Sequence, residues 1–169
     1  MTVRAGQSFD ASRAGTEVTE LLVADVPAAG PTTAEGDPAT GEWTGTTGAG
    51  FHIVPLWEGE SLTGLYDAAW EAAEGIGTTH LTHLTEVLSA HWGPHHVITL
   101  DGPLLRWHQS QPVHPLFHAL FSQDLYGELH VWHVDNRWIA ITVGHSDGDA
   151  PLVLAAVVST EAIQQPPGP

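Results

Sequence analysis

The chain has 169 residues, with 20 Asp and Glu against four Arg and no Lys, and its formal net charge is −16. This length supports one domain with a sizeable core. The charge argues against nucleic acid as a ligand, because phosphate binding needs Lys and Arg, and the absence of Cys excludes disulfides, thiolate zinc sites and cysteine nucleophiles.

No apolar run approaches the length of a membrane span, and the N-terminus MTVRAGQSFDAS lacks a hydrophobic region after its charge. We therefore expect neither a membrane span nor a signal peptide, and a cytoplasmic location.

Residues 1–50 are rich in Gly, Ala, Thr, Pro and acidic side chains, as in AAGPTTAEGDPATGEWTGTTGAG. Such a segment buries too little apolar surface to offset its ordering entropy, which predicts a flexible acidic segment. The run VTELLVADV, residues 18–26, could instead form an edge strand or a short helix that docks on the core. A chain that starts near Glu42 should then keep its cooperative unfolding.

The predicted domain spans residues 51–160, followed by a tail over 161–169. Its first element is a short strand over 51–57, which Pro55 places at a sheet edge or ends early. An amphipathic helix follows from the N-cap Ser61, and Gly75 and Gly77 end it. Its inward residues are Leu62, Leu65, Tyr66, Ala69, Trp70 and Ala73.

A second helix is expected from Thr79 to Trp92, where Gly93-Pro94 stops it. Residues 96–101 then read as a strand closed by the turn Asp101-Gly102-Pro103, and residues 113–121 as a short helix.

The stretch 126–160 predicts three consecutive antiparallel strands. Asp135-Asn136 tolerates φ > 0 between runs rich in Trp, Val and Ile, which indicates a hairpin turn. That turn pairs Val134 with Arg137 and His133 with Trp138, and continues with Trp132–Ile139, Val131–Ala140, His130–Ile141, Leu129–Thr142 and Glu128–Val143. Residues 152–158 are apolar at every position, as in a strand buried on both faces.

This order of elements predicts the α+β class, with an antiparallel sheet made of the C-terminal three-stranded meander plus one or two further strands. Two to three helices should pack on one face of the sheet. Neither face of the predicted hairpin is cleanly polar, so helices or a partner should cover part of both.

One catalytic pattern is present. Gly144-His145-Ser146-Asp147-Gly148 matches G-x-S-x-G and resembles the nucleophile elbow of α/β-hydrolases and thioesterases, which implies Ser146 as nucleophile with His145 beside it. In that family the acid and the His follow the Ser, whereas no His follows Ser146 here. The same residues are typical of a strand-to-strand turn, and we predict that Ser146 is a turn residue.

Twelve His residues raise a second possibility. His80, His83 and Glu86 lie at helical spacing, which could place two imidazoles and a carboxylate on one face for a divalent metal. His130 and His133 point to opposite faces of a strand and cannot share a metal. His133, which pairs with Trp138, is the predicted buried imidazole.

Seven Trp residues form the third feature. Trp43 and Trp107 are expected at the surface, where Trp is enriched among interface anchors. An apolar pocket for a small ligand is the competing interpretation. The charged candidates for partner contact are Arg106, Asp135, Asp147 and Asp149.

The stretches LTHLTEVLSAHWGPHHVITL and ELHVWHVDNRWIAITVGH resemble small actinobacterial proteins, some of which look like immunity proteins encoded beside secreted polymorphic toxins. This resemblance implies a small, acidic α+β domain without an active site, and a toxin as partner.

These features favour a non-enzymatic acidic binding protein that masks a basic surface of another protein and needs no cofactor. The alternatives are a small His-rich enzyme or ligand-binding or metal-binding module, and a serine hydrolase that uses Ser146. Partner binding should weaken with salt and at mildly acidic pH, where His protonation reduces the negative charge.

Overall fold

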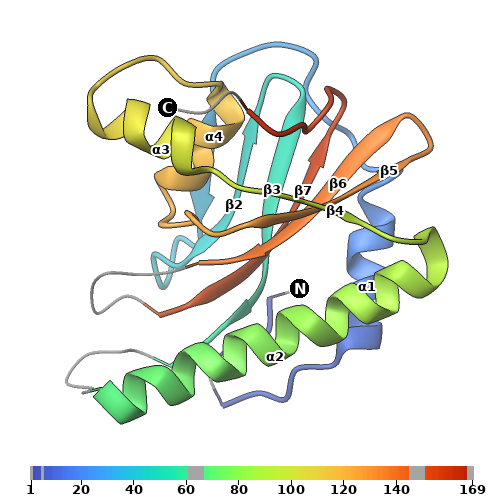
Figure 1. Ribbon diagram of the computed structural model, residues 1–169, viewed down its shortest axis with the longest axis vertical. Coiled ribbons are helices and arrows are strands. Elements are labelled where there is room, and N and C mark those ends of the chain that lie inside the picture. The colour runs from blue at the N-terminus through green and yellow to red at the C-terminus, as the bar shows by residue number, and fades with distance from the viewer. Residues whose placement is uncertain (1, 5, 61–66, 145–150, 167–169) are drawn as a thin grey trace.

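The fold is a seven-stranded antiparallel sheet with helices on both faces (Figure 1). The computed structural model describes residues 2–4, 6–60, 67–144 and 151–166. The sheet order is β1-β2-β3-β7-β6-β5-β4. The strands are β1 (Thr33–Gly36), β2 (Trp43–Gly48), β3 (Phe51–Glu58), β4 (His96–Ile98), β5 (Leu129–Val134), β6 (Arg137–Val143) and β7 (Val153–Ser159), and the helices are α1 (Ala11–Glu20), α2 (Asp67–Trp92), α3 (Asp101–His108) and α4 (Pro115–Phe121).

The C-terminal meander β5-β6-β7 is confirmed, together with the register of its hairpin. His133 pairs with Trp138 and Val134 with Arg137, as the Asp135-Asn136 turn requires. Both turn residues have positive φ, 51° and 66°, which suits the tight turns that match strand twist. β7 is an interior strand between β3 and β6, and residues 154–159 are all buried.

β3 is also an interior strand, although Pro55 predicted an edge. It lies between β2 and β7 and continues past the proline to Glu58. The register against β7 shifts between Pro55 and Trp57, so the proline sits at an irregularity of the ladder. A bulge removes the need for the N–H that proline lacks, and this is how the strand continues.

One helix of 26 residues, α2, replaces the two helices expected over this region. Gly75 and Gly77 lie inside it and do not end it. Gly77 is buried, and a Cβ there would lie 3.1 Å from Val143, so the helix approaches the sheet closely at this point. Gly93, with φ of 82°, follows the last helical residue as predicted. The expected N-cap Ser61 and the inward residues 62, 65 and 66 lie outside the described residues.

The region after α2 differs in detail from expectation. β4 has only three residues, and Asp101-Gly102-Pro103 begins α3 where a turn was expected. Proline is tolerated in a first helical turn because its missing N–H has no partner there. The next helix, α4, was predicted, and the His114 imidazole caps it by accepting a hydrogen bond from the Leu116 N–H at 3.1 Å.

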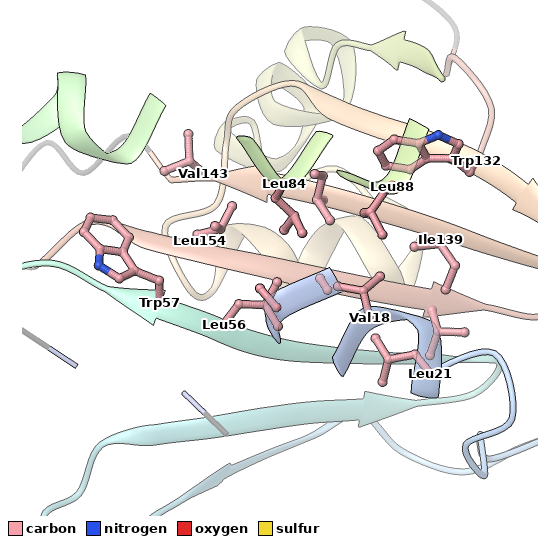
Figure 2. Close-up of a cluster of buried hydrophobic side chains, with 14 of the residues drawn as sticks. Val18, Leu21, Leu56, Trp57, Leu84, Leu88, Trp132, Ile139, Val143 and Leu154 are labelled. Atoms are coloured by element: carbon pink, nitrogen blue, oxygen red, sulfur yellow. The ribbon is translucent and has the colours of Figure 1, made fainter. Parts of the chain in front are cut away.

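The helices occupy both faces of the sheet, and each face carries its own core. The first core packs α1 and α2 on one face, and Figure 2 shows Trp57 and Trp132 at its opposite ends. The second core packs α3 and α4 on the other face, around Leu120, Phe121 and Val157. Alternate residues of β6 and β7 supply the two cores, because successive strand residues point to opposite faces.

Residues 1–50 contain α1, β1 and β2, whereas composition predicted a flexible segment. Asp10 caps α1 by accepting hydrogen bonds from the N–H groups of Ser12 and Arg13. The apolar face of this helix is short, but Ala14, Val18 and Leu21 are buried in the first core. Tertiary packing thus orders a segment whose composition alone would leave it flexible.

Part of the expected C-terminal tail is also docked. Ile163 is buried in the second core, and the Gln165 side chain accepts from the Thr99 N–H at 2.9 Å and donates to the Thr99 carbonyl at 3.1 Å. Among the described helices, none is both long enough and apolar enough to cross a bilayer.

A candidate protein-binding cleft

An acidic cleft of about 200 Å³ opens beside Trp43, one of the predicted interface anchors. Five parts of the chain form it: the start of β2, the end of β3, the loop after α4, Gly144 after β6 and the approach to β7. Its carboxylates come from Glu42, Glu58 and Asp124, and Leu125, Leu152 and Val153 add apolar surface. We call this site the acidic cleft.

Arg4 joins two of these carboxylates. Its Nε lies 3.3 Å from a Glu42 oxygen, its Nη1 pairs with Glu58, and its Nη2 donates to the Trp43 carbonyl at 3.4 Å. Val3 holds this segment in place, because it exchanges backbone hydrogen bonds with Leu56 and Glu58 beside β3. One guanidinium pairs with two of the three carboxylates, so the cleft keeps an excess of negative charge.

Trp43, the first residue of β2, is held in a fixed position. Its indole N–H donates to the Thr46 hydroxyl at 2.9 Å, and its ring is half-buried against the second core. An indole fixed in this way loses little side-chain entropy when a partner covers it, which is the property of an interface anchor.

The other predicted contact residues lie elsewhere. Trp107 and Arg106 are half-buried on α3, where the Trp107 ring packs 5.4 Å from that of Phe121. Asp135 is exposed in the turn between β5 and β6. The structure therefore brings Trp43, but not these three residues, to the acidic cleft. Asp147 and Asp149 lie outside the described residues.

The G-x-S-x-G stretch begins at the cleft. Ser146 and His145 lie outside the described residues, whereas Gly144 is described and has a structural reason to be glycine. Its N–H donates to the Val153 carbonyl at 2.9 Å, and a Cβ would lie only 2.9 Å from the Asp124 carbonyl oxygen. Close backbone approach therefore accounts for the first glycine of the motif.

The three metal candidates all lie on α2, in different surroundings. His80 packs its ring 4.4 Å from Phe9 and 4.9 Å from Trp57, while His83 and Glu86 are exposed. Across the part of the chain that the structure describes, no group of three or more His, Asp or Glu could hold a metal ion.

The structure also pairs two imidazoles that the sequence did not suggest as partners. His130 Nδ1 on β5 lies 3.0 Å from His95 Nε2. Burial lowers the pKa of His130, His95 lowers it further, and Glu128 opposes both. His133, the predicted buried imidazole, is exposed and stacks on Trp138 with ring centroids 4.3 Å apart. His133 lies beyond the part of β5 that pairs with β4, next to the hairpin turn, where its ring packs on Trp138 and stays open to solvent.

Sequence reasoning identified Trp43 but none of the cleft carboxylates. Glu42, Glu58 and Asp124 are far apart along the chain and lie in no motif, and only the adjacency of Glu42 to Trp43 was a usable signal. Comparison with protein-family models, with curated proteins and with solved structures finds no match for this chain.

Proposed function

We propose that this chain is a non-enzymatic, cytoplasmic binding protein of the immunity type, which masks a basic surface of another protein. The acidic cleft carries the proposal. It places three carboxylates and one arginine around a fixed Trp, so a cationic side chain of the partner gains both ion pairing and an aromatic surface.

The charge of the whole chain supports the same function. Four Arg can neutralise at most four of the 20 carboxylates. Arg137 is used inside the fold, where its Nη1 donates to the Leu21 and Ala24 carbonyls. The remaining negative charge would attract a basic partner over long range and speed association.

The test is capture of a partner from a lysate of the producing organism, with the full chain immobilised. A variant with Glu42→Gln, Glu58→Gln and Asp124→Asn removes the cleft charges and keeps side-chain size. We expect a basic protein on the native chain, at least about tenfold less of it on the variant, and release in roughly 0.5 M NaCl.

The control changes three exposed carboxylates outside the cleft: Glu20→Gln, Asp25→Asn and Glu86→Gln. It removes the same net charge and should capture the partner nearly as well as the native chain. Thermal unfolding verifies that both variants fold. Equal loss on the two variants, or equal capture by the cleft variant and the native chain, contradicts the cleft as the contact site.

A further inference from the structure

A second cavity has a volume of about 410 Å³ and shares Leu152 with the acidic cleft, while its other lining residues are different. It is open to solvent on one side and is lined by the first half of α2, the end of β3 and residues 6–7. We call it the Trp57 cavity. Its volume falls within the range of about 300–1,000 Å³ that is typical of small-molecule sites.

Small side chains on α2 create the space. Ala69, Ala72 and Ala73 face the cavity from the helix, and Trp57 and Leu152 form apolar walls. Ile76 also lines the cavity and is 52 % exposed, which leaves a large apolar side chain in contact with water. A bound molecule would cover this surface, and its burial would favour binding.

The backbone fixes the indole of Trp57. A Cβ on Gly59 would lie 2.9 Å from the far edge of the ring, and a Cβ on Gly77 would lie 3.5 Å from it. Glycine at these two positions lets the ring lie flush against both chain segments. The aromatic wall of the cavity is therefore formed before any ligand arrives.

His80 supplies the one imidazole of the cavity. Its ring lies edge-on to Trp57 and tilted over Phe9, which sets its orientation. Burial lowers the pKa of His80, and His83 lowers it further, which favours the neutral form of the ring. Within the described ranges neither ring nitrogen has a hydrogen-bond partner, so one nitrogen can serve a ligand.

The charge around the cavity selects against anions. Glu60 lines it, the neutral His80 offers no positive charge, and the chain carries a formal net charge of −16. We propose that the Trp57 cavity binds a neutral, mainly apolar small molecule that packs against the edge of Trp57, Ile76 and Leu152 and shares one hydrogen bond with His80.

The test uses two fluorescent probes that share one aromatic framework, applied to the full chain. N-phenyl-1-naphthylamine is neutral and carries one N–H, and 8-anilinonaphthalene-1-sulfonate adds an anionic group to the same framework. We expect saturable, one-to-one binding of the neutral probe and at least about tenfold weaker binding of the anionic probe. No binding of the neutral probe, or equal affinity for both, overturns the proposal.

Matched variants locate the site. Ala73→Leu fills the cavity and should weaken binding of the neutral probe at least about tenfold, whereas Ala90→Leu makes the same change at an exposed position of α2 and should not. His80→Leu should cost about fivefold, the worth of one neutral hydrogen bond. Ala72→Leu, at an exposed position of the cavity wall, replaces Ala73→Leu if that variant does not unfold cooperatively. Undiminished binding to the filled variant contradicts the assignment.

Discussion

His130 and His95 share a hydrogen bond that exists only while at least one of the two rings is neutral. The bond joins β5 to the segment after α2, and the Trp132 indole N–H reinforces this junction by donating to the Gly93 carbonyl at 3.0 Å. Two protonated imidazoles would present only donors and like charges. The contact between His95 and His130 thus makes the junction of β5 with the segment after α2 sensitive to pH.

We expect stability to fall between pH 7.5 and pH 5.5. The pKa of His130 is lower in the folded chain than in the unfolded one, so the unfolded chain binds more protons over this window. The stabilising contribution is present above the unfolded value of about 6.5 and is lost as pH falls toward the folded value. Burial lowers the pKa of His52 and His80 in the same direction.

Urea unfolding at the two pH values measures this effect. His130→Gln should be less stable than the native chain at pH 7.5, by about 1 kcal/mol for the lost hydrogen bond, and should lose less stability on acidification. His133→Gln changes an exposed ring and is the control. A pH dependence of His130→Gln equal to that of the native chain would refute the role of the pair.

At the scale of elements, α2 shows how packing overrides a local signal. Gly75 and Gly77 are both helical, yet a Cβ on Gly75 would meet nothing within 4 Å, whereas a Cβ on Gly77 would meet Val143, Trp57 and Leu152. The helix tolerates two glycines because its other turns pack Leu84 and Leu88 into the first core. Of these two glycines, Gly77 alone lies too close to its neighbours for a larger side chain to fit without a shift.

Alanine at these two positions should therefore have different effects. Gly75→Ala should raise the free energy of unfolding by about 1 kcal/mol, through helix propensity alone. Gly77→Ala gains the same propensity but forces the Val143 methyl to move from a 3.1 Å contact, so it should gain less or lose stability. Chemical denaturation of both variants gives the comparison. Equal stabilisation by the two substitutions would show that α2 can move away from Val143 without a loss of stability.

At the scale of the whole molecule, the N-terminal segment completes the first core. Val18 is fully buried, Leu21 nearly so, and Arg137 ties the end of α1 to β6 through the Leu21 and Ala24 carbonyls. α1 and α2 also approach so closely that a Cβ on Gly15 would lie 2.8 Å from Val87. The segment is thus an integral layer of the fold.

This packing changes the expectation for a shortened chain. A chain that starts at Glu42 loses α1, β1 and Arg4, and exposes Leu84 and Leu88 of α2. We expect it to lose the cooperative thermal transition of the full chain, which circular dichroism and calorimetry would follow. An unchanged transition would show that the residues before Glu42 are dispensable for folding, as their composition predicts.

Two valines provide the matched control. Val18→Ala removes buried methyl groups and should cost about 2 kcal/mol, whereas Val23→Ala changes a side chain that is 86 % exposed and should have no measurable effect. If α1 did not pack on the core, the two substitutions would be equivalent.

Local chemistry by itself determined the meander. Asp135 and Asn136 accept positive φ, a two-residue turn admits one register, and the apolar run 152–158 indicates an interior strand. The class of the fold, the end of α2 at Gly93 and the helix α4 were predictable for the same reason, because neighbouring residues specify them. Asp10 followed by Ala14, Val18 and Leu21 was a usable capping and periodicity signal for α1.

Only the tertiary structure decided the features that depend on contacts between distant residues. Pro55 lies in an interior strand because a bulge accommodates it, and residues 1–50 are ordered because the sheet and α2 bury them. The acidic cleft joins Arg4, Glu42, Glu58 and Asp124, and the Trp57 cavity exists where β3 meets small residues of α2. Each of these features depends on contacts between segments that are distant in the sequence. No local pattern specifies such contacts, since burial and proximity are properties of the packed fold.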